Sequence, residues 1–222
     1  MSQPTLAFLP LARQTFDMEL ARQVTALARE NLQSAGFPII GPNHPITDLA
    51  SAQSVAADLQ RSSYDLLVIF QATFADSSLV TTLAEASPAP CFLWAVPETP
   101  TGGRLRLNSL CGINLAGHAL TLRGKKYDYA YLAAEDPKII HKIQPFAKAG
   151  YVKRKLASAR LGVIGEHPEG MDSCHLDSAR LHKAFGLEVV NLSLDTVFAR
   201  ARSIPTQTIM MTRELLDQQL NN

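Results

Sequence analysis

The chain has 222 residues, of which 46% are hydrophobic and 18% charged, and its 21 Lys and Arg against 20 Asp and Glu leave a net charge of +1. This composition is typical of a globular chain and argues against disorder, collagen-like repeats and coiled coil. A balance so close to neutral selects neither nucleic acid nor an anionic membrane as partner, so the function has to be sought in local features.

Apolar runs of strand length alternate with stretches of helical periodicity through the first 132 residues. The expected strands are Thr5–Leu9, Phe37–Ile40, Leu66–Phe70, Cys91–Val96 and Tyr127–Leu132, and helices are expected at about 48–63, 77–86 and 111–123 and after the first strand. The run Leu66–Phe70 does not alternate with polar residues, which indicates burial on both faces, as in a parallel sheet covered by helices. The β-α-β-α order predicts a doubly wound (Rossmann-like) α/β fold with helices on both faces of the sheet.

The first helix is predicted to be amphipathic. Thr15 is a candidate N-cap and Gly36 a stop signal. The side chains expected on its buried face, spaced by three to five residues, are Phe16, Leu20, Val24, Leu27 and Leu32.

A basic segment follows the first alternation. Residues 123–160 hold 10 basic and 3 acidic side chains, and within them Asp136 and Pro137 begin a further helix that Pro145 is expected to kink or end. The charges are compatible with a site for phosphate or a polyanion. A solvated helix and linker is the preferred interpretation, because no aromatic or Gly-rich recognition pattern accompanies them.

A second alternation begins at Arg160. It predicts a strand at Leu161–Gly165, a helix at about 172–185 closed by Gly186, a strand at Leu187–Leu192, and helices at about 194–202 and 212–220. Two strands do not make a stable open sheet by themselves. We therefore expect an amino-terminal domain at 1–158, with a basic helix or linker at about 133–159, and the beginning of an incomplete second α/β domain at 160–222.

Cysteine usage and the terminal segment bear on the compartment. Cys91, Cys111 and Cys174 are too few and too widely spaced for a disulfide framework or a CxxC zinc site, which favours a reduced, cytoplasmic location. No basic region precedes the first apolar run, and no apolar stretch approaches 18 residues, so neither export nor membrane insertion is expected.

Ligands of open α/β sheets bind beyond the carboxyl ends of the strands, so the candidate residues lie in the loops there. Arg13 follows the first strand. Its guanidinium could donate hydrogen bonds to a hydroxyl or carboxylate oxygen, and an ordinary surface residue is the equally plausible alternative. After the third strand, Phe74 is suited to stacking on the apolar face of a sugar. Asp76 is suited to accepting a hydrogen bond from a hydroxyl, to capping the next helix, or to both.

The longest loop, Pro97–Asn108, contains Glu98 and is a candidate lid or intersubunit arm. The next helix carries Asn114 and His118. A single histidine on a helix of Leu and Ala is more often a packed, hydrogen-bonded residue than a base, and that interpretation is preferred for His118.

The stretch from Gly162 to Gly170 lacks the glycine and lysine pattern of a phosphate loop and would place two carboxylates against any phosphate. The residues that suggest a metal there are Glu166, His167, Glu169, Cys174 and His175, but their spacing matches no standard ligand pattern. No nucleophile elbow, paired histidine helix or CxxC is present. The sequence thus offers binding groups without a catalytic centre.

The segment GEHPEGMDSC at 165–174, followed by FGLEVV at 185–190 and LDTVFAR at 194–200, resembles the start of the second domain in the L-fucose/L-arabinose isomerase family. LARQTFD at 11–17 and ATF at 72–74 resemble loop segments of the family's first domain. The resemblance extends over essentially all of the chain.

The resemblance implies a carbohydrate-converting enzyme, an intramolecular oxidoreductase of the aldose–ketose isomerase type. In that family a divalent metal, usually Mn²⁺, holds two adjacent sugar oxygens while a carboxylate carries a proton between C1 and C2 through an ene-diol. The metal and catalytic residues of the family follow the position at which this sequence stops, so none is carried over to this chain.

The resemblance also implies that this portion of the chain faces the substrate, a monosaccharide, and forms part of the interface between subunits. The expected assembly is a homo-oligomer, a trimer or hexamer. Arg13 and Phe74 match positions facing the sugar, Asp76 is a weaker match, and Glu98, Asn114 and His118 are assigned to substrate binding from loop position. The alternative is a non-catalytic sugar-binding or regulatory α/β module.

Overall fold

The computed structural model describes residues 3–220. They divide into two compact units, which meet between Arg154 and Lys155.

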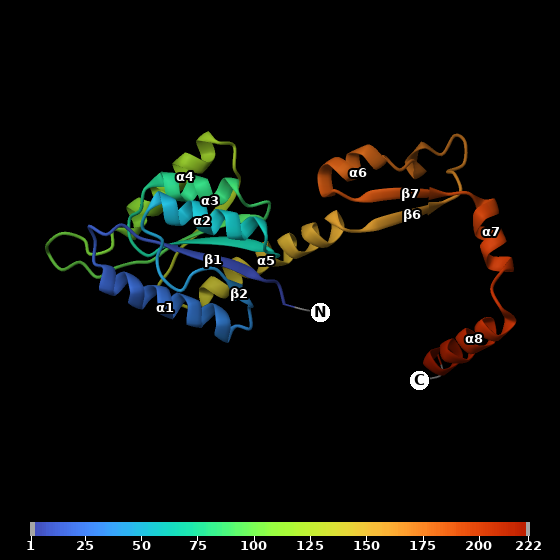
Figure 1. Cartoon of the computed structure of the whole chain (residues 1–222), viewed down its shortest axis with the longest axis horizontal. Coiled ribbons are helices and arrows are strands. Elements are labelled where there is room, and N and C mark those ends of the chain that lie inside the picture. Colours follow the sequence, from blue (N-terminus) through green and yellow to red (C-terminus); the bar gives the residue numbers. More distant parts are fainter. Residues whose placement is uncertain (1–2, 221–222) are drawn as a thin grey trace. The chain divides into compact units, whose positions relative to one another are not determined.

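The first unit is built on a five-stranded sheet in which all neighbouring strands are parallel (Figure 1). Across the sheet the strands are β2 (Ile39–Ile40), β1 (Leu6–Leu11), β3 (Leu66–Gln71), β4 (Cys91–Ala95) and β5 (Tyr127–Tyr131). The helices that connect and follow them are α1 (Met18–Ser34), α2 (Leu49–Gln60), α3 (Ser77–Glu85), α4 (Ser109–Leu122) and α5 (Lys138–Ala157). The predicted doubly wound α/β fold is confirmed.

The sheet has a separate hydrophobic core on each face. In β1, Ala7, Leu9 and Leu11 pack with buried residues of α2, α3 and α4, whereas Leu6 and Phe8 pack with those of α1 and α5. Every residue of β1, β3 and β4 is buried. The unbroken apolar runs in the sequence therefore reflect strands covered on both sides.

The predicted cap of α1 is corrected by the structure, and its predicted buried face is confirmed in part. Asp17, not Thr15, is the N-cap, and its side chain accepts a hydrogen bond from the Leu20 N–H. Of the predicted buried face, Leu32 is fully buried, and Leu20 and Val24 are partly buried against the same core, whereas Leu27 is 43% exposed. The other buried residues of α1 are Ala21, Thr25 and Ala28. The helix packs against large side chains such as Phe8, and small residues at the contact allow the close packing of a protein interior.

Pro145 was expected to kink or end its helix, and the second alternative is wrong, because α5 continues through it to Ala157. Pro145 lies on the exposed side of α5, as does His141, whose carbonyl loses its helical partner to the proline. The opposite side is anchored through Ile143 and Ala147, and Gly150 packs directly on the backbone of Asp65.

The second unit has a two-stranded parallel sheet, β6 (Arg160–Ile164) and β7 (Glu188–Leu192). The predicted helix at 172–185 is only partly present: a short 3₁₀ turn, η1 (Asp172–Cys174), precedes α6 (Ser178–Phe185), which Asp177 caps. The predicted stop is confirmed, since Gly186 ends α6 at a φ of 75°. The remaining helices are α7 (Leu194–Arg202) and α8 (Thr206–Leu220), the latter beginning six residues before its predicted start.

Few apolar side chains of the second unit are buried. Those on α7 and α8 that are more than half exposed are Leu194, Phe198, Ile209, Met210, Met211, Leu215, Leu216 and Leu220. No helix between residues 3 and 220 combines the length and apolar character needed to cross a bilayer.

Candidate functional site

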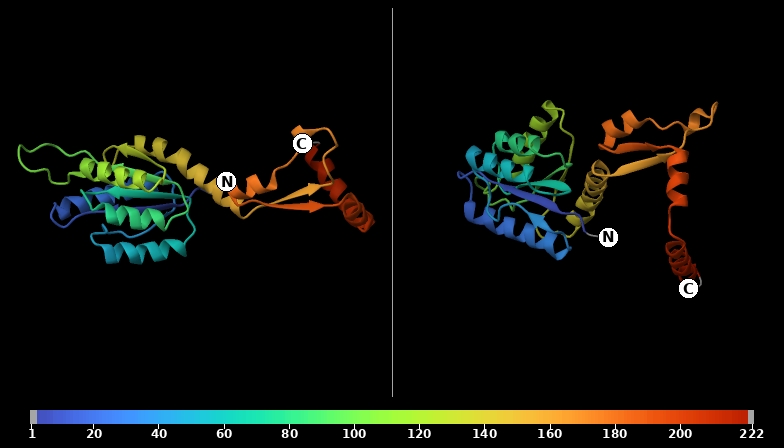
Figure 2. Two further views of the ribbon diagram at one scale, coloured as in Figure 1. Left: turned by 90° about the horizontal axis from the view of Figure 1, so that it is seen from above. Right: turned by 45° about the vertical axis from the view of Figure 1, so that its right-hand side comes forward.

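Three loops meet at the carboxyl end of the first unit's sheet, where β1, β3 and β4 end (Figures 1 and 2). Backbone hydrogen bonds join them: the Thr73 N–H donates to the Leu11 carbonyl at 3.3 Å, and the Phe74 N–H donates to the Leu107 carbonyl at 2.7 Å. The Asp17 N–H donates to the Arg106 carbonyl at 3.0 Å. The long β4–α4 loop is thereby attached to both of the shorter loops.

Arg13 and Asp76, two of the sequence candidates, form an ion pair between loops. Arg13 Nη1 lies 3.2 Å from Asp76 Oδ1, and the side chains are 47% and 56% exposed. The backbone N–H of Arg13 donates a hydrogen bond to Thr73 Oγ1 at 2.8 Å, and this bond fixes the backbone there. Asp76 occupies the N-cap position of α3, but its side chain makes no capping hydrogen bond. The pair thus presents a donor and an acceptor to solvent.

An aromatic pair lies beside these charges. The rings of Phe16 and Phe74 are 6.0 Å apart at an interplanar angle of 43°, and both side chains are half-buried. The guanidinium of Arg104 lies 5.2 Å from the centre of the Phe16 ring. Within residues 3–220, Arg104 forms no ion pair with a carboxylate. Phe16, Phe74 and Arg104 are called the aromatic shelf below.

Glu98, predicted to face substrate, shapes its own loop. Its carboxylate accepts hydrogen bonds from three consecutive backbone N–H groups, those of Arg106 at 2.7 Å, Leu107 at 2.9 Å and Asn108 at 2.7 Å. Asn108 has a left-handed φ of 51°, and successive N–H groups of such a segment form an anion-binding nest. Glu98 fills this nest from within the chain, so the carboxylate closes the loop.

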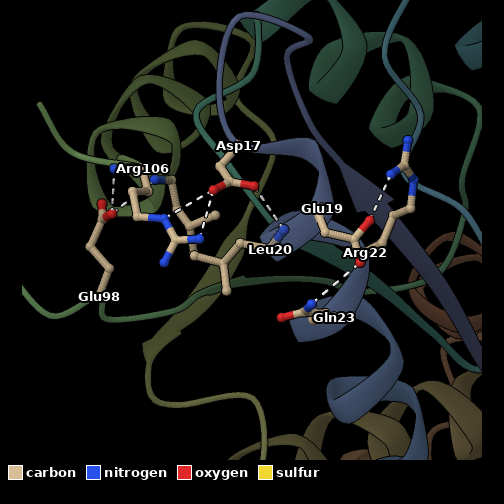
Figure 3. Close-up of polar contacts among 8 residues, drawn as sticks. Asp17, Glu19, Leu20, Arg22, Gln23, Glu98 and Arg106 are labelled. Carbon is tan, nitrogen blue, oxygen red and sulfur yellow. Dashed lines mark hydrogen bonds and ion pairs between the residues drawn. The ribbon is translucent and has the colours of Figure 1, made fainter.

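The second anchor of this loop is the pair Arg106 and Asp17 (Figure 3). Arg106 donates from Nε and Nη2 to Asp17 Oδ2 at 3.0 and 2.7 Å, while Asp17 Oδ1 accepts the Leu20 N–H at 2.9 Å. The Leu20 N–H and then the Arg106 guanidinium lower the pKa of Asp17 below its ordinary value of 3.8. Sequence reasoning missed this anchor, because its two residues are separated by 89 positions.

Asn114 and His118 lie one turn apart on the exposed side of α4. The contacts that join the three loops in the described part of the chain involve neither residue. His118 is exposed, so the expectation of a packed histidine is wrong. The alternation of buried and exposed positions along α4 puts it on the solvent side of a helix whose other side covers the sheet.

Gln71, the last residue of β3, is fully buried beneath the loops. Its carbonyl accepts a hydrogen bond from the Ser109 hydroxyl at the start of α4. Its side-chain Oε1 and Nε2 form no hydrogen bond within the described part of the chain. Gly112 permits this packing, since a Cβ there would lie 2.9 Å from Gln71 Oε1 and 3.1 Å from the Phe74 Cα.

The second unit has a cavity of about 840 Å³ at the carboxyl ends of β6 and β7. Glu166, His167, Cys174 and His175 line it, and the two imidazole rings lie 5.3 Å apart, edge to face. No three His, Cys, Asp or Glu side chains among residues 3–220 converge in a way that would hold a metal ion. The described residues therefore do not fit a manganese centre.

Comparison with known proteins gives a family and several relatives. A family model described as the amino-terminal domain of fucose/sulfoquinovose isomerase matches residues 7–157. A sulfoquinovose isomerase of Alkalicoccus urumqiensis is 29% identical over 97% of this chain, and one of Clostridium sp. (strain MSTE9) is 29% identical over 98%. A sulfoquinovose isomerase of Priestia megaterium is 25% identical over 93%.

The matches cover 48%, 48% and 46% of those three relatives. The chain thus spans about half the length of the curated relatives it matches.

Proposed function

The chain belongs to the fucose/sulfoquinovose isomerase amino-terminal domain family, and we propose that it forms the substrate-facing part of an aldose–ketose isomerase for a sulfonated sugar. The observation that carries the proposal is the cluster of Arg13, Asp76 and the aromatic shelf at the carboxyl edge of the sheet. The relatives' printed names, sulfoquinovose isomerase, supply the substrate class.

The chemistry of the cluster suits a sugar that carries an anionic group. An aromatic ring offers an apolar surface to the C–H face of a pyranose, and the ring of Phe74 is half-buried at this edge. Arg13 and Asp76 offer a donor and an acceptor to hydroxyl groups. Arg104 has no carboxylate partner in the described chain, so its guanidinium remains available for a sulfonate, which it can bind through two parallel hydrogen bonds.

In this proposal the described residues bind and orient the sugar, and the proton transfer between C1 and C2 belongs to groups outside this chain. The absence of a metal-holding cluster among residues 3–220 supports that division. Glu98 and Asp17 act as positioning residues, because they hold the loop that carries Arg104.

We further propose that additional polypeptide completes the second unit and brings the metal site. Two strands and exposed apolar helices are too little to bury a core of their own. The assembled enzyme is a cytoplasmic homo-oligomer, a trimer or hexamer, in which the aromatic shelf of one subunit faces the metal site of another. The chain's span of about half of its relatives is consistent with a further catalytic portion.

A chimera tests the proposal. Residues 1–222 of this chain replace the matching half of the Alkalicoccus urumqiensis relative. The chimeric protein is then assayed with Mn²⁺ for isomerisation of sulfoquinovose. We expect activity, with a raised KM in Arg104→Met and an unchanged KM in Arg22→Met, an exposed arginine on α1. A folded chimera that binds no sulfoquinovose would contradict the proposal.

The alternative, a sugar-binding or regulatory module without catalysis, is favoured by one feature. The cluster lies wholly within the first unit, whose five-stranded sheet is covered on both faces. Calorimetry of the 222-residue chain with sulfoquinovose, L-fucose and L-arabinose separates the two functions. Saturable binding that Phe74→Ala weakens, together with an inactive chimera, would support the module.

A further inference from the structure

A second cavity lies in the first unit, at the end of the sheet opposite to the three loops. Its volume is about 630 Å³, and it opens where β4 and β5 begin, at Cys91 and Tyr127. Its lining residues are Pro88, Ala89, Pro90, Cys91, Lys125, Lys126, Tyr127, Asp128, Phe146 and Lys153. Its lysines belong to the basic segment at residues 123–160, which has no role in the proposed function.

Three lysines from two parts of the chain surround this cavity. Lys125 Nζ donates to the Ser87 carbonyl at 2.8 Å, and Lys153 Nζ donates to the Pro88 carbonyl at 3.3 Å. Lys126 is exposed and has no partner within residues 3–220. Each bond to a carbonyl uses one of the three donors of an ammonium group, so all three lysines keep N–H groups for a ligand.

The charge at the cavity is unbalanced. Asp128 is the single carboxylate among the lining residues, so the three ammonium groups leave two positive charges uncompensated. A phosphate monoester carries a charge of about −1.5 to −2 at neutral pH and three acceptor oxygens. Its charge matches the excess, whereas a sulfonate would neutralise only one of the two.

The other walls are apolar. Phe146 is half-buried and its ring lies 5.7 Å from that of Phe92, which fixes it against the sheet. Pro88 and Pro90 bring rigid, apolar rings to the rim. A cavity that combines such walls with convergent cations is typical of a site for a small organic ligand rather than for an inorganic ion.

We propose that this cavity binds an organic phosphate monoester, with the phosphate among Lys125, Lys126 and Lys153 and the apolar or aromatic body against Phe146 and the prolines. The site is separate from the sugar-facing loops, because it lies where β4 and β5 begin, whereas those loops follow the carboxyl ends of β1, β3 and β4. It is independent of the isomerase proposal, since it needs neither a metal nor a further polypeptide.

The test uses phenyl phosphate as the probe and the full 222-residue chain. Calorimetry is expected to show saturable binding that weakens with added salt, and the backbone amide resonances of Ala89, Cys91 and residues 125–128 are expected to shift on titration. Lys126→Gln removes one charge-assisted contact and should weaken binding by about tenfold. Lys148→Gln is the matched control, an exposed lysine of α5 outside the cavity lining, and should leave the affinity unchanged.

Three results would overturn the proposal. The first is no heat and no shift of these resonances with phenyl phosphate. The second is equal affinity for inorganic phosphate and phenyl phosphate, which would show that the apolar walls contribute nothing. The third is an equal loss in Lys126→Gln and Lys148→Gln, which would show diffuse attraction to surface charge.

Discussion

Arg106 directs two N–H groups at one oxygen of Asp17, at 3.0 and 2.7 Å, while the other oxygen of Asp17 caps α1 (Figure 3). One carboxylate thus holds both the start of a helix and the long loop that carries Arg104. The arrangement couples the position of the aromatic shelf to the ionisation of Asp17.

The first prediction concerns pH. The pKa of folded Asp17 lies below its ordinary value of 3.8, so its carboxylate stabilises the fold fully above that value and loses the effect as the pH falls through the folded pKa. Asp17→Asn should therefore lower the free energy of unfolding at neutral pH and make progressively less difference below about pH 4. Urea unfolding followed by Trp94, the single tryptophan and fully buried in the first unit, measures this.

Glu30→Gln is the control for that experiment, because Glu30 is an exposed carboxylate of the same helix without an ion pair among the described residues. It should show no such dependence on pH. A constant difference between wild type and Asp17→Asn from neutral pH to about pH 2 would contradict the role assigned to the carboxylate.

The second prediction concerns the buried amide of Gln71. A buried polar group without a hydrogen bond costs about 1–3 kcal/mol, so Gln71→Met, which keeps the shape, should raise the free energy of unfolding by about 1 kcal/mol. Tyr64→Phe is the contrasting variant, since its buried hydroxyl is paired with Ser87 Oγ at 2.9 Å, and it should lower stability by about 1 kcal/mol. Destabilisation by Gln71→Met would contradict the prediction, because it would show that the side-chain amide stabilises the folded protein.

The third prediction concerns Gly150 of α5, which packs on the backbone of Asp65 just before β3. A Cβ at this position would overlap the Asp65 carbonyl, which belongs to the backbone and has little freedom to move. Gly150→Ala should destabilise the first unit by about 3 kcal/mol. Gly103→Ala, where a Cβ meets nothing within 4 Å, should change stability by less than about 0.5 kcal/mol in the same denaturant titration.

The fourth prediction concerns thiol reactivity. Burial raises the pKa of the Cys91 thiol to about 12, so almost none of it is thiolate at neutral pH. Cys111 and Cys174 are exposed. Ellman's reagent should therefore label two thiols quickly and the third only after unfolding, and mass spectrometry should place the slow site at Cys91. Rapid labelling of Cys91 in the folded chain would contradict the packing of β4.

Much of the fold was predictable because its signals are local. The apolar run Leu66–Phe70 predicted a strand buried on both faces, and β3 is buried throughout. Gly186 predicted a helix end, and it adopts the positive φ that favours glycine. On α1 the prediction is right for Leu20, Val24 and Leu32 but wrong for Leu27. The choice between Leu27 and the smaller Ala28 depends on the shape of the sheet beneath, which periodicity does not contain.

The candidate site was predictable in composition but not in geometry. Arg13, Phe74 and Asp76 could be selected because they follow the ends of strands, yet the pairing of Arg13 with Asp76 joins residues 63 positions apart. The role of Glu98 also depends on how the loop folds back, since its carboxylate accepts N–H groups 8 to 10 residues further along.

Local sequence patterns were enough to predict the order of the strands and helices, the buried character of the central strands, and the loops that hold the candidate ligand-binding groups. These properties follow from apolar periodicity, caps and turn residues, which act over a few neighbouring positions. The tertiary structure alone decided that Asp17 anchors Arg106 and that Arg104 lies over Phe16. The physical reason is the strand order: β1, β3 and β4 lie adjacent in the sheet, and this brings together side chains that are distant along the chain.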